Sequence, residues 1–216
     1  SRGLGDVYKR QVGTNALVAN TTGTENVAVG VASLDANTTG NENTAVGASA
    51  LSANTTASNN TAVGRMALRD NTAVNNTAVG HQTMITNTTG AANVAIGIAA
   101  LDANTTGAQN VAVGENALGA NTTADYNTAL GSSSLLLNTT GTQNVAIGAF
   151  AMDSNSTGNY NTALGYQALR ENETADSNTA VGFKAMLTNT TGASNSGVGR
   201  SSLQLNTTGS YNTGLG

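Results

Sequence analysis

The sequence predicts an all-β fold, a repetitive β-solenoid or β-roll in which each 17-residue repeat forms one coil. Three observations lead to this class. One short pattern recurs along nearly the whole 216-residue chain, which is typical of stacked supersecondary units. Every copy contains glycine and is rich in asparagine and threonine, which disfavour helix. Only 38% of the residues are hydrophobic and 3% aromatic, so a bulky core is not expected.

The repeat has a fixed template of seventeen positions. It reads Asn, Thr or Val, Ala, an aliphatic residue, Gly, two variable residues, a small residue, Leu or Met, two variable residues, N-T-T, Gly or Ala, and two variable residues. Its first positions are Asn26, Asn43, Asn60, Asn76, Asn93, Asn110, Asn127, Asn144, Asn161, Asn178 and Asn195, with a partial copy at Asn212. Stacked coils lie about 4.8 Å apart, so eleven copies predict a rod roughly 50 Å long.

Each part of the template has an expected conformation. N-T-A-V-G, as at 43–47, indicates a short strand ended by glycine, and the following x-x-A-L-x-x stretch indicates a second strand. N-T-T-G is typical of a turn. We expect positive φ at Gly30, Gly47 and Gly64, where a Cβ would clash.

The strand is apolar on both of its faces. In Val27-Ala28-Val29, successive side chains point to opposite sides of the sheet, yet all three are apolar. We therefore expect one side to face the coil interior and the other to face a partner chain.

The chain divides into two unequal parts. Residues 1–11 do not match the repeat and lack the apolar centre of a secretion signal, so we expect an artefactual leader. Residues 12–216 are expected to form a single solenoid array, with eleven full repeats over 26–211 and partial repeats at both ends. Because the array starts and stops inside a repeat without a polar cap, head-to-tail stacking of copies is a further expectation.

The asparagines are the principal candidate stacking residues. Those at the first position, given above, and those at the twelfth position are each expected to form an amide ladder along the rod. One repeat departs from the template, since Asn60 and Asn76 are sixteen residues apart and N-T-A-V-N replaces N-T-T-G-x-x. We expect a local stacking defect there.

The N-T-T turn also matches the N-x-Ser/Thr glycosylation pattern. The candidate acceptors are Asn20, Asn37, Asn54, Asn87, Asn104, Asn121, Asn138, Asn155, Asn172, Asn189 and Asn206. The competing interpretation is that these asparagines are buried stacking residues, which no transferase could modify. Sugars on every coil would also be crowded, at about 5 Å spacing. The sequence leaves both readings open, including glycans on some Asn or Thr side chains.

Composition and spacing argue against several function classes. A net charge of −4 and scattered basic residues do not favour nucleic acid binding. The single histidine, His81, has no partner with metal-ligand spacing, and Asp35, Asp102 and Asp153 do not recur in consecutive copies. No apolar run approaches the roughly 18 residues of a membrane span. We therefore expect no catalytic residue, no metal and no cofactor.

The variable pairs are the positions expected to face solvent. They include Arg65-Met66, Tyr166-Gln167 and Phe183-Lys184, which could contact a carbohydrate or a neighbouring fibre. Threonine rows on solenoids can also bind ice, but the second position alternates irregularly between Thr and Val. Ice binding is therefore a distant alternative.

The repeat resembles two known kinds of array. Its N-T-A-V-G and N-V-A-I-G units resemble the N-S-V-A-I-G units in the heads of trimeric autotransporter adhesins. The longer pattern, as in 161–169 followed by a turn like 189–192, is similar to repeats in tail-fibre-like proteins of phages and bacteria. The resemblance covers residues 12–216 and implies a trimer of β-rolls. The adhesin repeat is shorter and lacks N-T-T-G, so no binding residue is carried over.

Form and resemblance together predict a structural function. We expect a non-enzymatic extracellular repeat protein that forms a fibre, filament or appendage segment, at a cell surface or on a virion, and that associates with itself. The alternative is an adhesin or tail-fibre segment that binds a host glycan or matrix protein.

Overall fold

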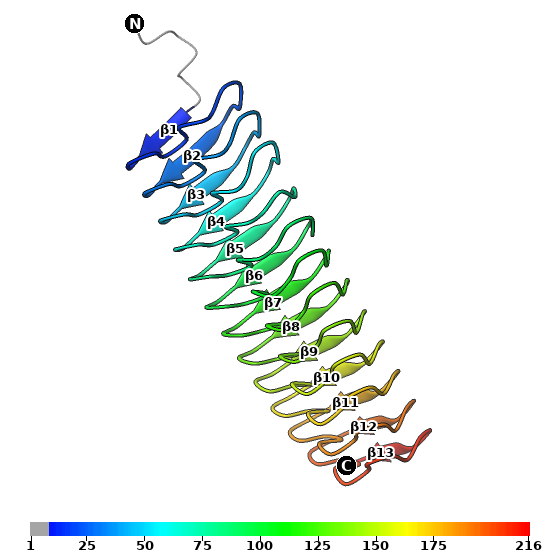
Figure 1. Ribbon diagram of the computed structural model, residues 1–216. Helices are drawn as coiled ribbons and strands as arrows, with labels where there is room; N and C mark the ends of the chain where they lie inside the picture. Colours follow the sequence, from blue (N-terminus) through cyan, green and yellow to red (C-terminus); the bar gives the residue numbers. More distant parts are fainter. Residues whose placement is uncertain (1–8) are drawn as a thin grey trace, which may run out of the picture.

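The computed structural model describes residues 9–216 and is an all-β solenoid, which confirms the predicted fold class (Figure 1). Its thirteen strands form one parallel sheet in chain order, with β1 and β13 at opposite ends of the rod. The strands are β1 (Lys9–Val12), β2 (Asn26–Val29), β3 (Thr44–Val46), β4 (Thr61–Val63), β5 (Thr77–Val79), β6 (Val94–Ile96), β7 (Val111–Val113), β8 (Thr128–Leu130), β9 (Val145–Ile147), β10 (Thr162–Leu164), β11 (Thr179–Val181), β12 (Ser196–Val198) and β13 (Thr213–Leu215).

Equivalent residues of successive repeats pair with one another. Val27 of β2 pairs with Thr44 of β3, which in turn pairs with Thr61 of β4. The register continues through the short repeat, because Thr61 pairs with Thr77 of β5. The predicted stacking of one repeat per coil is therefore confirmed.

The second strand predicted for the x-x-A-L-x-x stretch is wrong. In every coil of residues 9–216 this stretch forms turns. Its seventh and ninth positions are left-handed, with φ of 52° at both Ala32 and Leu34, and such residues cannot continue an extended strand. Their N–H groups still bond to the adjacent coils, from Ala32 to the Thr14 carbonyl (2.9 Å) and from Leu34 to the Ala50 carbonyl (2.9 Å). The stretch is thus tied to both neighbours without being a strand.

The glycine at the fifth position ends each strand at a close contact between coils. As predicted, φ is positive at Gly30 (137°), Gly47 (136°) and Gly64 (138°). A Cβ on Gly30 would lie 2.6 Å from the carbonyl carbon of Gly47. Because backbone meets backbone here, no side chain can be accommodated.

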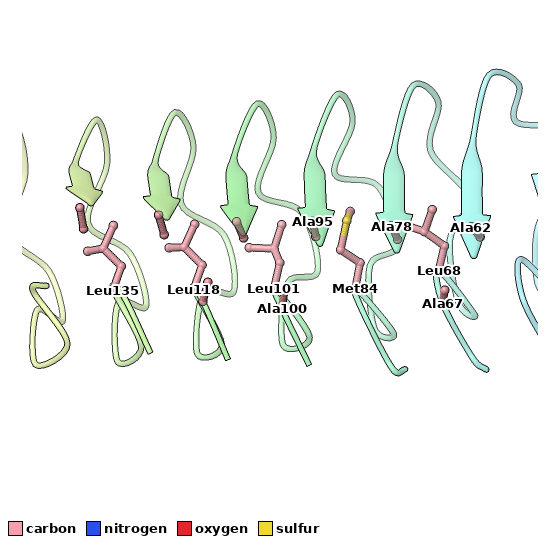
Figure 2. Packing of buried hydrophobic residues seen from close by; sticks show 14 of the residues in the cluster. Ala62, Ala67, Leu68, Ala78, Met84, Ala95, Ala100, Leu101, Leu118 and Leu135 are labelled. Carbon is pink, nitrogen blue, oxygen red and sulfur yellow. The ribbon is translucent and has the colours of Figure 1, made fainter. Parts of the chain in front are cut away.

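The core is a single column of side chains that runs along the rod. Alanine at the third position points inward from the strand, and Leu or Met at the ninth position points toward it from the opposite turn; Ala95 and Leu101 are both fully buried. Figure 2 shows this row, one large residue per coil, at Leu68, Met84, Leu101, Leu118 and Leu135. Because the core is only one side chain thick, small and aliphatic side chains fill it and few aromatic residues are needed.

The sheet begins earlier than the predicted boundary at residue 12. Most of the predicted leader, residues 1–8, lies outside the described residues. Lys9–Val12 forms β1 and pairs in parallel with Asn26–Val29. Backbone pairing does not require the side chains of the template, so the departure in sequence does not prevent an added strand.

Candidate functional site: two amide ladders and an outer sheet face

The asparagines of the N-T-T-G turn form a buried ladder. Asn37 Nδ2 donates to Asn20 Oδ1 in the preceding coil (2.7 Å) and to the Gly40 carbonyl in its own turn (3.0 Å). Asn104 repeats the arrangement, with 2.7 Å to Asn87 Oδ1 and 2.9 Å to the carbonyl of residue 107. One amide therefore closes its own turn and joins two coils.

The asparagines at the first position form a second buried ladder. Asn26 Nδ2 donates to the Gly40 carbonyl (2.7 Å), and Asn26 Oδ1 accepts from the backbone N–H of Asn43 (3.0 Å). The predicted stacking residues from Asn26 through Asn195 are buried in this row, whereas Asn212 in the last coil is exposed. Because buried polar groups are costly without partners, this pairing makes an amide interior possible.

The predicted glycosylation acceptors are the same side chains as the turn ladder. Those from Asn37 through Asn189 are 0% exposed, Asn20 is 8% exposed, and Asn206 is half-buried. A sugar on Nδ2 would have to replace hydrogen bonds that close the turn and join the coils. In the folded rod, an intact ladder and an N-linked glycan at the same asparagine are therefore mutually exclusive.

The short repeat interrupts the turn ladder on one side. It lacks the fourteenth residue of the template, so Asn71 Nδ2 donates to the Ala73 carbonyl (2.7 Å) and makes no bond to Asn54. Asn54 Oδ1 is left buried without a partner among the described residues. On the other side the ladder continues, because Asn71 Oδ1 accepts from Asn87 Nδ2 (2.7 Å). A stacking defect is therefore present between the coils that begin at Asn43 and Asn60.

The outer side of the sheet is uncharged along its length. We call this the sheet face and define it as the second and fourth repeat positions of β2–β13. It carries Thr, Val, Ile, Leu and one Ser, and no charged residue. Half of the fourth-position side chains are exposed, for example Ile96 (41%), Leu130 (45%) and Leu164 (43%), and the others are half-buried. The inward alanines confirm that one face of the strand lines the coil interior.

Ionisable groups are dispersed over the rod. His81 Nε2 lies 3.2 Å from Arg65 Nη1, a contact between two exposed side chains of adjacent coils. Within residues 9–216, no three His, Asp or Glu side chains come close enough together to hold a metal ion. Over the same residues, no helix is long and apolar enough to span a membrane.

Tyr166 and Phe183 were predicted to face solvent, but their clustering with Phe150 was not predicted from the sequence. Phe150, Tyr166 and Phe183 lie on successive coils, and the Tyr166 ring contacts the other two, although the repeat template marks their positions as variable. The signal was the spacing: Tyr166 and Phe183 are one repeat apart, and aromatic residues are rare in this chain.

No family model, curated protein or solved structure matches this chain. The parallel solenoid with one repeat per coil is established by the structure itself. The likeness to autotransporter adhesins and tail-fibre-like proteins remains a likeness of the repeat sequence.

Proposed function

We propose that this chain is a non-enzymatic structural repeat protein, a segment of an extracellular fibre, filament or appendage, whose copies associate side by side through the sheet face. The observation that carries the proposal is the uncharged surface of aliphatic and hydroxyl side chains that continues from β2 to β13. Large contiguous apolar patches on soluble proteins commonly mark interaction sites. The occupant proposed is a second copy, because an equally long and regular face fits it coil by coil.

The size of the sheet face supports this role. Two outward residues from each of twelve strands make twenty-four side chains, and specific interfaces commonly use about 20–30 residues on each side. The resemblance to adhesin heads favours three copies around one axis. In such a trimer, the neighbouring copies would cover the aliphatic side chains at the fourth position.

The surface composition supports an extracellular location, at a cell surface or on a virion. Charged residues make up 9% of the chain, so solvation depends on hydroxyl and amide groups.

Sedimentation equilibrium of the purified full chain tests the association. The wild type is expected to sediment as an oligomer at micromolar concentration, and the double variant Ile96→Lys with Leu130→Lys as a monomer with unchanged circular dichroism. Leu137→Lys is the matched control, because Leu137 is 51% exposed but lies at the eleventh position, outside the sheet face. A folded wild type that stays monomeric over the whole concentration range contradicts the proposal.

The same material distinguishes the alternatives. Thermal hysteresis of freezing, measured on a monomeric wild type, would favour ice binding by the rows of the sheet face. Binding of cells or glycans by an oligomer would make the rod an adhesin as well as a scaffold.

A further inference from the structure

The corner that follows the strand carries an aromatic and cationic cluster. We call it the aromatic corner; it consists of Phe150, Tyr166, Phe183, Lys184 and Arg200. These residues occupy the sixth or seventh position of four successive coils, beginning at Asn144, Asn161, Asn178 and Asn195. Because aromatic residues make up 3% of the chain, three in contact form a distinct surface.

The rings cover one another's faces. Tyr166 and Phe183 are stacked, with centroids 5.6 Å apart and planes inclined by 16°, and Phe150 meets Tyr166 edge to face at 6.2 Å. Lys184 Nζ lies 5.3 Å and the Arg200 guanidinium carbon 5.6 Å from the Phe183 centroid. The three rings nevertheless remain 36–43% exposed. The Tyr166–Phe183 stack and the two cations therefore cover part of the ring faces.

The cations of the aromatic corner have no acidic partner. In residues 9–216 the ion pairs are Arg69–Asp70 and Arg170–Asp153, and neither includes Lys184 or Arg200. The nearest acidic residue at the sixth or seventh position is Glu115, and a coil that carries serine at both positions separates it from the coil of Phe150. In these four coils, the sixth and seventh positions thus carry two cations and no acid, on a chain of net charge −4.

We propose that the aromatic corner binds an acidic polysaccharide, a polymer that carries carboxylate or sulfate groups. Lys184 and Arg200 pair with the acidic groups, while the Tyr166 hydroxyl and the half-buried Gln167 amide bond to sugar hydroxyls. The side chains of the aromatic corner lie on successive coils, so an extended polymer that lies along the rod contacts several coils at once. Single-stranded nucleic acid fits less well, because bases stack on uncovered ring faces.

This site is separate from the face proposed for self-association. The sheet face uses the second and fourth repeat positions, whereas the aromatic corner uses the sixth and seventh. Loss of oligomerisation in the sheet-face variants and loss of polysaccharide binding in corner variants can therefore be measured independently.

The test is titration of the full chain with alginate, a carboxylated polysaccharide, by isothermal calorimetry at low and moderate salt. The corner variant combines Tyr166→Ile, Phe183→Val, Lys184→Ser and Arg200→Ala. Each new residue already occupies the same repeat position in another coil, at Ile98, Val31, Ser49 and Ala48, so the coil is expected to keep its fold. The control combines Tyr160→Ala with Arg65→Gln, which removes an exposed tyrosine and an exposed cation elsewhere.

Alginate is expected to bind the wild type and the control alike, more weakly as salt rises, and at least tenfold more weakly to the corner variant. Neutral dextran is expected not to bind. The proposal is overturned if the folded wild type does not bind alginate, if the control loses as much affinity as the corner variant, or if single-stranded oligothymidine binds as tightly as alginate.

Discussion

At the scale of single residues, the unusual feature is the left-handed backbone of ordinary side chains. The seventh, ninth and seventeenth positions have φ near 50–60° in coil after coil, as at Ala99 (52°), Leu101 (54°) and Gln109 (57°). Each such residue costs about 1–2 kcal/mol relative to right-handed backbone. Bonds to adjacent coils offset this cost, since Leu101 N donates to the Ala117 carbonyl (2.9 Å) and Gln109 N to the Ala91 carbonyl (3.0 Å).

Exchange of alanine for glycine should therefore have opposite effects at two nearby sites. Ala99→Gly relieves left-handed strain, which outweighs the added freedom of the unfolded chain, so the free energy of unfolding should rise by roughly 0.5–1 kcal/mol. Ala95→Gly, in β6, removes a fully buried methyl group and adds backbone freedom to a strand. The free energy of unfolding should therefore fall by about 1–2 kcal/mol. Denaturant unfolding measures both. Equal losses at the two sites would show that the left-handed conformation carries no strain.

One carboxyl group gives the rod a defined response to pH. Burial raises the pKa of Asp102, and the smaller effect of the Asp102 and Ala103 backbone amides opposes it. A carboxyl whose pKa is raised on folding destabilises the folded state while it is ionised. This cost is fully present at neutral pH, shrinks as the pH falls through the raised pKa, and disappears below the ordinary value of 3.8.

Asp102→Asn should accordingly raise the melting temperature at pH 7, and its advantage over the wild type should vanish in acid. Asp70→Asn is the opposite control, because hydrogen bonds donated by Arg69 lower the pKa of the Asp70 carboxyl. Asp70→Asn should lower the stability modestly at neutral pH, since the pair is partly exposed to solvent. Melting curves from pH 7 to pH 3 give both profiles, and a pH-independent effect of Asp102→Asn would contradict this account.

At the scale of the coil, the N-T-T-G turn combines a structural amide with a solvent-facing threonine. Asn104 is fully buried and hydrogen-bonded, whereas the Thr106 side chain is exposed. The hydroxyl of Thr105, between them, donates to the Thr122 carbonyl of the next coil (3.0 Å). Three adjacent residues therefore have three different environments, although all belong to one N-x-Thr pattern.

Either Asn104→Ala or Thr106→Ala removes this glycosylation pattern, but their effects on stability should differ. Asn104→Ala leaves Asn87 Oδ1 without a donor and deprives Asn121 Nδ2 of an acceptor, so the free energy of unfolding should fall by about 2–4 kcal/mol. Thr106→Ala should change it by less than about 0.5 kcal/mol. Chemical denaturation and intact mass of protein from a glycosylating host are the measurements. A stable Asn104→Ala variant that loses a glycan mass would favour the glycosylated reading.

Features that depend on residue type and repeat period could be predicted from the sequence. Features that depend on contacts between neighbouring coils could not. The short strands, the need for glycine at Gly30 and the pairing of asparagines follow from residue type and period. The turn at Ala32 to Leu34 could not be predicted, because alanine and leucine have no preference for the left-handed region. Contacts from the coils on both sides impose that conformation. The aromatic corner was missed for a related reason: it depends on neighbours across coils, at positions that vary along the chain.

At the scale of the whole molecule, each coil contacts mainly its two neighbours, so the stability of the rod is close to a sum of coil and interface terms. The weakest interior interface should be the one with the ladder defect. There Asn54 Oδ1 has no partner, while the corresponding Asn37 Oδ1 accepts from Asn54 Nδ2 (3.0 Å). Among the described residues, Thr55 N makes no bond to the following turn, in contrast to Thr38 N, which donates to the Thr55 carbonyl (2.7 Å).

Insertion of one threonine between Thr72 and Ala73 restores the N-T-T-A sequence and should repair this interface. Asn71 Nδ2 then reaches Asn54 Oδ1, and the free energy of unfolding should rise by about 1–2 kcal/mol. Hydrogen exchange gives the local measurement: the Thr55 and Thr56 amides should exchange faster than those of Thr105 and Thr106 in the wild type and become protected in the insertion variant. The matched control inserts threonine between Thr105 and Thr106, in a complete turn, where it should weaken the ladder. If the native Thr55 amide is already as protected as that of Thr105, the short repeat is not a weak interface.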